Sequence, residues 1–325
     1  MDRVFSYKAY EWQRNIILHL FMMQIPHSGV SPAPVLLVCP TGGGKLSVRD
    51  VYSVMNAGIS LMITPLLSLG ADQASKITLK AKHNKGNICS IHLDKIRSKV
   101  DQTKVVTMIQ DIPFNSQTLI ILFTSPQALL NKHFPWGELL NWLIHHSRLS
   151  MVCIDKVHLF VHFGMTFRKE FKDLTPLLFD KLKVAKVGNK SRTTIPILFM
   201  TATCTKTVVD VIASVTGLNF ETDINVFWPS SSSMTHQHVF LEVQYSTSGM
   251  SLFKKKVGPS LKTSTVHKFI LYSNIRSTVL QVTPKLCEWI DHAGYKADIL
   301  KIVGTLHRDQ KFYHVRVFTK SNASP

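Results

Sequence analysis

The sequence is short of acidic side chains. Its 325 residues contain 20 Asp and Glu against 38 Lys and Arg, which gives a formal net charge of +18. This basic surplus favours a polyanionic partner, most often nucleic acid, although a merely solvated basic surface has the same composition. The surplus occurs both in residues 1–225 and in residues 226–325, so it is not confined to a basic tail.

Paired cysteines are also lacking. The five cysteines lie far apart in the chain and form no CxxC pair. This spacing excludes the common zinc-binding patterns, and we expect no zinc. Several of the cysteines lie in or beside apolar runs, which indicates free, buried thiols and a reducing, intracellular compartment.

Long apolar runs are missing as well. The longest one near the N-terminus, residues 16–25, is interrupted by His19 and Gln24 and is too short to span a bilayer. The first twelve residues are mixed and charged, unlike a signal peptide. We therefore expect no membrane association.

The most informative stretch is residues 35–50, VLLVCPTGGGKLSVRD. A short apolar run, predicted to be a strand, turns through three glycines into a predicted helix. Glycines let backbone N–H groups approach an anion closely, and the helix N-terminus adds partial positive charge. A plain glycine turn is the simpler explanation, but a lysine directly after such a turn favours phosphate binding. The predicted phosphate site comprises Thr41, Gly42, Gly43, Gly44 and Lys45.

The next residue departs from the P-loop pattern. A P-loop carries Ser or Thr after the lysine, and that hydroxyl binds the magnesium of Mg-ATP. Here the position is Leu46, and the hydroxyl lies one place later on Ser47. One residue rotates a side chain by about 100° around a helix, so Ser47 should point away from the metal. The pattern predicts phosphate binding with impaired metal placement.

Short apolar runs recur along the first 200 residues, and each ends in a small polar cluster. With helical patterns between them, such runs predict an α/β fold with a parallel sheet and helices on both faces. Ligands of such sheets bind at the carboxyl ends of the strands, so the polar clusters should converge on one edge. The predicted strands are 35–39, 59–63, 119–123, 151–154 and 195–200.

The ordered set PTGGGK, TPLLSL, TSP, DKVH and TAT resembles the first motor domain of superfamily-2 helicases, with RecQ-type DNA helicases as the nearest type. The stretch 158–171, HLFVHFGMTFRKEF, resembles the RecQ aromatic-rich loop, and ILYSN at 270–274 resembles the first motif of a second motor domain. The resemblance implies a RecA-like fold followed by an incomplete second RecA-like unit. The implied domains are a helicase ATP-binding domain at 1–225, a linker at 226–238 and a partial second domain at 239–325.

The resemblance implies binding of ATP, Mg²⁺ and single-stranded or forked DNA, with RNA left open. Gln13 would read the adenine, although Tyr10 stands where the family usually has an arginine. Lys45 and Asp155 would be the catalytic groups, with Asp155 also holding the metal. The residues that would couple the nucleotide site to the bound nucleic-acid strand are His158, Thr201, Ala202 and Thr203. The nucleic-acid contacts would be Thr64, Thr124, Ser125, Phe163, Phe167 and Arg168.

Some of these residues have a second explanation. The hydroxyl residues at 64, 124 and 125 stand beside predicted helix starts, where Ser and Thr commonly cap helices. Phe167 and Phe171 are four residues apart and are equally well explained as core residues. Phe163, next to Gly164, favours stacking on a base, because aromatics interleaved with cations suit unpaired strands.

The nucleotide box departs from the family at a second position. The family has Asp-Glu there, and the Glu orients and deprotonates the attacking water; this chain has Asp155-Lys156. A protonated ammonium has no acceptor for that proton, and loss of a general base costs on the order of 10²–10⁴ in rate. Lys156 could instead neutralise phosphate charge where a metal would lie.

The C-terminal part matches the family less well. We predict a mobile loop at 247–264 and a helix at 278–293, and no late arginine-finger motif follows Asp309. Two functions are left open: an ATP-dependent 3′–5′ DNA helicase with impaired hydrolysis, or a non-catalytic binder of nucleotide and nucleic acid. A basic α/β enzyme of another kind is a third alternative. The resemblance also implies a monomer located in the nucleus.

The net charge leads to the first testable prediction. Binding of single-stranded DNA should weaken steeply with added salt, whether or not ATP is hydrolysed, because bound Lys and Arg release counterions from phosphates. Each phosphate contact should contribute about −0.7 to the slope of log affinity against log salt for a single strand. Fluorescence anisotropy with a labelled oligonucleotide measures this slope, and an affinity that barely changed with salt would contradict the prediction.

Overall fold

The structure is a computed structural model of the 325-residue chain. It describes residues 8–25, 34–56, 58–65, 70–77, 88–113, 116, 118–159, 173–182, 195–216, 226–227, 249–261 and 276–293. The chain divides into two compact units, Met1–Gln237 and His238–Pro325, and each is described by itself.

The first unit contains one seven-stranded sheet in the order β3-β4-β2-β5-β6-β1-β7. Every described pairing in it is parallel. The inner strands are mostly apolar because both of their faces are covered. The strands are β1 Val35–Val38, β2 Gly58–Ile63, β3 Ile88–His92, β4 Leu119–Thr124, β5 Leu149–Asp155, β6 Ile197–Thr201 and β7 Val226–Phe227.

Helices connect these strands. A helix over residues 70–77 follows β2. None of the helices in the described ranges is both long and apolar enough to cross a bilayer. The remaining elements of the first unit are α2 Glu11–Met22, α3 Lys45–Met55, η1 Leu93–Lys95, α5 Lys99–Gln110, α6 Pro126–Leu130, α7 Trp136–His145, η2 Thr175–Phe179 and α11 Lys206–Thr216.

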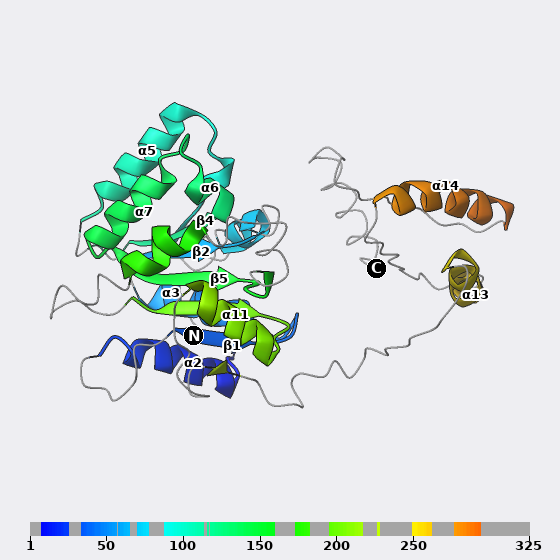
Figure 1. Cartoon of the computed structure of the whole chain (residues 1–325), viewed down its shortest axis with the longest axis horizontal. Helices are drawn as coiled ribbons and strands as arrows, with labels where there is room; N and C mark the ends of the chain where they lie inside the picture. Colours follow the sequence, from blue (N-terminus) through cyan, green and yellow to red (C-terminus); the bar gives the residue numbers. More distant parts are fainter. Residues whose placement is uncertain are drawn as a thin grey trace. The chain divides into compact units, whose positions relative to one another are not determined.

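The sheet has a core on each face. Neighbouring strand residues alternate between the two: Leu122 packs in the cluster that contains Leu140 of α7, whereas Phe123 packs in the cluster that contains Val51 of α3. In Figure 1, α5, α6 and α7 gather toward the β4 side of the sheet, and α2 lies toward the β1 side. Covering both faces leaves the ends of the strands as the accessible places for polar chemistry.

The predicted α/β architecture is confirmed. Five predicted strands are present as β1, β2, β4, β5 and β6, with bounds that agree within two residues. The prediction missed β3, an edge strand whose residues are mostly half-exposed and whose sequence ICSIH is not a continuous apolar run. It also missed β7: Val226, at the start of the predicted linker, pairs with Leu36 of β1 instead.

In the second unit, the structure describes two helices, α13 Gly249–Leu261 and α14 Arg276–His292. The helix predicted at 278–293 is confirmed as α14. The mobile loop predicted at 247–264 is wrong over most of its length, because Leu, Met and Lys residues there form α13 despite its glycines and Pro259. The ILYSN motif at 270–274 lies outside the described residues, and the second RecA-like domain stays a prediction.

Candidate nucleotide and nucleic-acid site

The phosphate turn, residues 41–45, connects the carboxyl end of β1 to α3. Gly42 and Gly44 have φ angles of 85° and 87°, in a region that residues with a Cβ rarely adopt. A Cβ at Gly43 would lie 2.6 Å from the Sγ of Cys39, so this position has no room for a side chain. The backbone and the packing beneath it therefore require all three glycines.

The turn is accessible to a ligand. Thr41 and Gly42 are exposed, and the residues from Gly43 to Lys45 are half-buried. Gly44 is the N-cap of α3, and no side chain caps this helix terminus. A helix N-terminus of this kind presents backbone N–H groups and a partial positive charge, which together suit a phosphate.

Gln13 lies directly against the phosphate turn and is 2% exposed. Its Oε1 accepts a hydrogen bond from the Tyr10 N–H at 3.0 Å, and its Nε2 donates to the Gly44 carbonyl at 3.0 Å. These hydrogen bonds of Gln13 connect the first turn of α2 to the start of α3. Because both ends of its amide have protein partners, adenine recognition by Gln13 stays a prediction.

Asp155 ends β5 and is 4% exposed. Its Oδ1 accepts from the backbone N–H of Lys156 at 2.9 Å, and its Oδ2 accepts from the Nε2 of Gln73 at 3.3 Å. Lys156 has a φ of 56°, a left-handed conformation that is unusual for a lysine. Backbone strain of this kind is concentrated at functional turns, and here it follows the strand that carries the carboxylate.

A buried arginine lies behind Asp155. Arg49 of α3 is 1% exposed; its Nη1 donates to the Gln73 Oε1 at 2.7 Å, and its Nη2 donates to the Asp50 Oδ1 at 2.6 Å. The guanidinium carbon lies 5.4 Å from the centroid of the Phe123 ring. Burial alone lowers the pKa of Arg49, but the carboxylates of Asp50 and Asp155 raise it, and the net shift is upward. Arg49 therefore stays charged in the interior.

These residues do not fit the magnesium position of the family. Leu46 packs against the core on the α2 and α3 face of the sheet, so the place of the metal-binding hydroxyl is taken by an apolar contact. Each oxygen of Asp155 accepts one hydrogen bond within the protein, so a metal-bound water would have to use the remaining lone pairs beside Lys156 and Gln73. Across the described ranges, no group of three or more His, Cys, Asp or Glu side chains is arranged to hold a metal ion.

The residues predicted to couple the two sites are brought together. The Nδ1 of His158 lies 2.7 Å from the Oγ1 of Thr201. The same hydroxyl donates to the Thr203 carbonyl at 2.8 Å, so the His158 nitrogen is the donor in their contact. The Thr201 carbonyl accepts from the Cys39 N–H at 2.9 Å, which joins this turn to the strand before the phosphate turn. Ala202 lies half-buried within the turn.

The three hydroxyl residues predicted to contact nucleic acid are buried: Thr64 is 1% exposed, Thr124 0% and Ser125 3%. The Thr64 N–H donates to the Thr124 carbonyl at 2.9 Å. The Ser125 hydroxyl caps α6 by accepting from the Ala128 N–H at 3.2 Å, and it donates to Asp94. For Ser125 this geometry favours helix capping over nucleic-acid contact.

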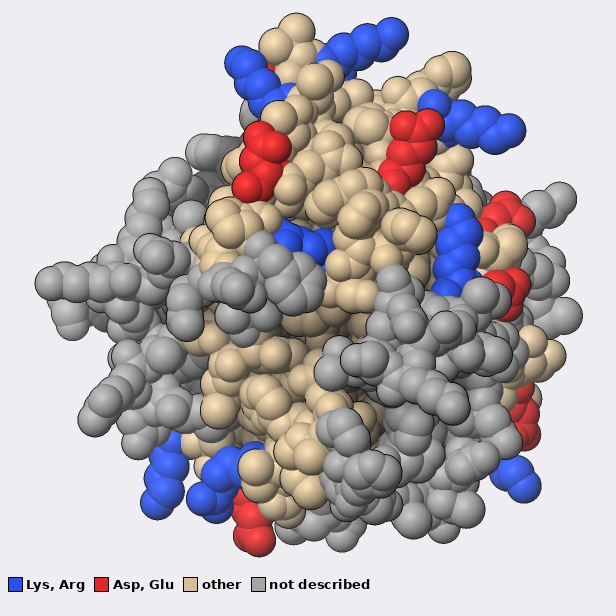
Figure 2. All heavy atoms as spheres, turned by 90° about the vertical axis from the view of Figure 1, so that its left-hand side faces the viewer, with Lys and Arg blue, Asp and Glu red and all other residues tan. Residues whose placement is uncertain are grey.

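The remaining predicted contacts, Phe163, Phe167 and Arg168, lie outside the described residues, so the aromatic loop stays a prediction. Figure 2 shows Lys and Arg side chains at several separate places on one face of the molecule, with Asp and Glu between them. On that face, the side chains that the structure describes therefore do not form one continuous basic patch.

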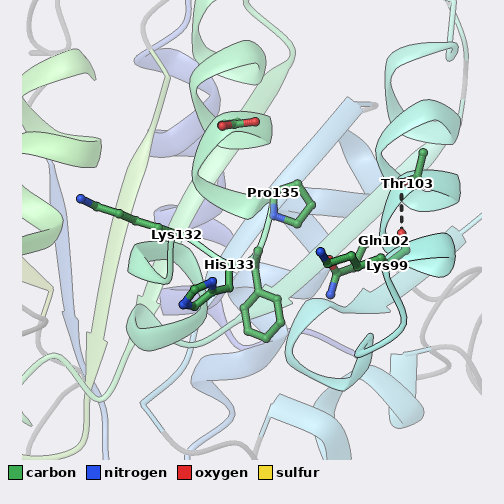
Figure 3. Close-up of a pocket in the computed structure, with 8 residues that line it drawn as sticks. Lys99, Gln102, Thr103, Lys132, His133 and Pro135 are labelled. Carbon is green, nitrogen blue, oxygen red and sulfur yellow. Dashed lines mark hydrogen bonds between the residues drawn. The ribbon is translucent and has the colours of Figure 1, made fainter.

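A hollow of about 270 Å³ lies away from the phosphate turn, between α5 and the start of α7 (Figure 3). None of the predicted site residues lines it. In Figure 3 the Lys132 side chain extends away from the other labelled residues, so its charge is not directed into the hollow. The lining residues are Lys99, Gln102, Thr103, Lys132, His133, Phe134, Pro135 and Glu138.

Comparison with known proteins gives a consistent set of relatives. The chain is 25% identical over 233 residues to the ATP-dependent DNA helicase Q-like 4B of Arabidopsis thaliana, which covers 67% of this chain and 18% of that protein. It is 27% identical over 139 residues to the ATP-dependent DNA helicase RecQ of Pasteurella multocida, covering 43% of this chain and 19% of that protein. Against the ATP-dependent DNA helicase Q5 of Mus musculus it is 24% identical over 149 residues, covering 46% and 14%. The chain thus spans 14–19% of the length of these relatives.

No protein-family model matches the chain. Among solved structures, the DUF1998 helicase MrfA bound to DNA and AMPPNP matches with a TM-score of 0.46 at 18% identity, covering 67% of this chain and 27% of that one. A hypothetical ATP-dependent RNA helicase from Sulfolobus tokodaii matches with a TM-score of 0.42 at 16% identity, covering 97% and 76%. Structural similarity with TM-scores and identities this low carries no information about the function of this chain.

The ordered motifs and the sequence relatives agree on a class. The chain is similar in sequence to helicases of the superfamily-2 type. Within that class, its similarity is to the RecQ-type ATP-dependent DNA helicases.

The placement of Ser125 leads to the second testable prediction. Ser125→Ala should lower the free energy of unfolding by about 1–3 kcal/mol, because it removes the hydroxyl that donates to the buried Asp94 carboxylate and accepts from the Ala128 N–H at the first turn of α6, while the Ser125 N–H keeps its own bond to Asp94. Oligonucleotide affinity should stay within about twofold, since a 3%-exposed hydroxyl cannot reach a phosphate.

Ser98→Ala is the matched control, because Ser98 caps α5 from an exposed position through a contact of 3.5 Å to the Asp101 N–H. It should cost only about 0.5 kcal/mol. Urea denaturation and fluorescence anisotropy measure the two quantities. A Ser125→Ala protein of unchanged stability but much weaker oligonucleotide binding would show that Ser125 contacts the strand.

Proposed function

We propose that the first unit binds ATP at the phosphate turn and single-stranded or forked DNA along the same edge of the sheet. The main support is convergence: the phosphate turn follows β1, Asp155 ends β5, and Thr201 ends β6. These three strands are neighbours in the order β5-β6-β1. The carboxyl ends of adjacent parallel strands form one binding edge, although the residues are far apart in the sequence.

The proposed activity is ATP binding with little or no hydrolysis. In the family, a carboxylate after the nucleotide-box Asp activates water, whereas this chain has an ammonium on Lys156. With Leu46 the chain lacks the hydroxyl that would hold the metal, and the half-buried Leu46 side chain packs against the core. The relatives are named ATP-dependent DNA helicases and thus suggest the ligands, while these two residues argue against turnover. Any helicase activity that remains would have the 3′–5′ direction. A location in the nucleus, action as a monomer and preference for DNA over RNA are part of this proposal.

Each side chain of the site then has a binding role. Lys45 and the backbone N–H groups at the start of α3 hold the phosphates, and Lys156 adds a second cation at the end of β5. The hydrogen bond between His158 and Thr201 ties the end of β5 to the end of β6. A bound nucleotide would therefore meet a rigid edge rather than three independent loops.

Hydrolysis provides the third testable prediction. The unaltered chain should show no ATP turnover above background with Mg²⁺, with or without single-stranded DNA. The double variant Leu46→Ser/Lys156→Glu restores the metal-binding hydroxyl and the general base, so it should gain turnover if the edge is otherwise intact. Phosphate release assays measure both proteins.

Turnover by the unaltered chain would contradict the proposal and require another group to act as the base. If neither protein hydrolysed ATP, the loss of turnover would be due to parts of the chain other than these two positions. Ligand binding would then be the remaining activity. Because Leu46→Ser also removes a core contact, the stability of the double variant has to be measured beside its activity.

The cation at position 156 provides the fourth testable prediction. A fluorescent ATP analogue should bind in EDTA as well as in Mg²⁺, because Lys156 supplies positive charge without a metal. Lys156→Ala should weaken that binding by about tenfold or more, the loss expected for one charge-assisted contact. The control is Lys104→Ala, which removes an exposed lysine of α5 that pairs with Asp101. Equal affinity in the Lys156→Ala and unaltered proteins would rule out this role.

A further inference from the structure

We propose that Gln73 is a positioning residue that couples the nucleic-acid side of the site to the nucleotide carboxylate, Asp155. This inference rests on the proposed function, since it needs both ligands to bind. Gln73 lies on the helix over 70–77, outside every motif residue assigned above, and is 4% exposed.

The orientation of the Gln73 amide is determined by its two partners. Arg49 can only donate, so it must face the Gln73 oxygen, and the carboxylate of Asp155 accepts from the Gln73 nitrogen. The two contacts are 2.7 Å and 3.3 Å long. Gln73 thus lies between a buried cation and a buried anion, and a rotation of its amide would break both contacts at once. Charge-assisted hydrogen bonds in a dry interior are strong and sensitive to geometry.

On one side, this contact reaches the phosphate turn. Arg49 lies four residues after Lys45, one turn further along α3. The helix that presents the phosphate turn therefore also supplies the donor to Gln73. A phosphate that shifts the first turn of α3 would shift Arg49 with it, because the two residues belong to one rigid helix.

On the other side, the helix over 70–77 begins at the carboxyl ends of the β-strands, where single-stranded DNA is proposed to bind. A Cβ at Gly70 would lie 2.7 Å from the Oγ1 of Thr64 and 2.9 Å from the Nε2 of His92, so the helix start is packed directly on the ends of β2 and β3. A ligand that moves this edge would have to move the helix as well. Its far side is exposed, with an ion pair of 2.7 Å between Lys76 and Asp72.

The resulting chain of contacts runs from the proposed nucleic-acid edge, at the ends of β2 and β3, through the helix over 70–77 to Gln73. From Gln73 it reaches the nucleotide site twice, through Asp155 and through Arg49 of α3. It joins the two ligand sites through one side chain that touches neither ligand. If Gln73 were only a satisfied core residue, its replacement would change stability but not the dependence of one ligand on the other. Coupling between sites is therefore the quantity that separates the two explanations.

The experiment measures the affinity of a fluorescent ATP analogue with and without saturating oligo(dT), using the full chain. In the unaltered protein the two affinities should differ by about fivefold or more, the lower range of typical coupling. Gln73→Leu removes both contacts, whereas Gln73→Glu keeps the Arg49 contact but places a second carboxylate beside Asp155. In both variants, the ratio of the affinities with and without oligo(dT) should fall to within about twofold. Gln73→Glu is isosteric, so it serves if Gln73→Leu does not fold.

The matched control is Gln102→Leu. Gln102 is also a glutamine that is 4% exposed on a helix, but it donates only to the carbonyls of Ile96 and Arg97. This variant should lose stability and keep the coupling ratio of the unaltered protein. If the Gln73 variants also kept that ratio, the positioning role would be wrong.

The failures of the two proposals are distinguishable. If the unaltered chain binds each ligand alone but the affinities are independent, the proposed function stands and the inference about Gln73 is overturned. If it binds neither the ATP analogue nor oligo(dT), both are overturned.

Discussion

The buried charge of Arg49 is the interaction on which the rest of the site depends. A guanidinium that is 1% exposed needs compensating negative charge and hydrogen bonds, since an unpaired ion in the interior is strongly destabilising. Asp50 compensates it from the same helix, and Gln73 connects it to Asp155 on β5. This requirement fixes α3, the helix over 70–77 and the end of β5 relative to one another, and with them the phosphate turn and the nucleotide carboxylate.

Much of the fold could be predicted from the sequence, for a physical reason. Strands that are buried on both faces need unbroken apolar runs, and each of the five predicted runs became a strand. The edge strand β3 escaped prediction because its residues are mostly half-exposed and do not form a continuous apolar run. The other edge strand, β7, escaped because its two apolar residues, Val226 and Phe227, are too short a run to indicate a strand. Helix α13 escaped because its Gly, Ser and Lys residues suggested a loop, although Lys, Leu and Met are good helix formers.

The candidate site divides along a similar line. The glycine turn could be predicted because φ angles of 85° and 87° require glycine and leave a local signature. The burial of Thr64 and Ser125 could not, because the same hydroxyl serves a helix cap or a phosphate equally well. The roles of Arg49 and Gln73 could not be predicted either, because both stand on helices among other polar and charged residues. Their partners lie 24 and 82 residues apart in the chain, a separation that no local pattern encodes.

The close contact beneath the phosphate turn has a consequence for the chemistry of Cys39. Its thiol fills the space that a Cβ at Gly43 would occupy, so an oxygen added to that sulfur would have to displace the backbone above it. Burial raises the pKa of the Cys39 thiol, which keeps the reactive thiolate scarce near neutral pH. The shape of the phosphate turn is thus coupled to the low redox reactivity of a single sulfur atom, because oxidation of that sulfur would require the turn to shift.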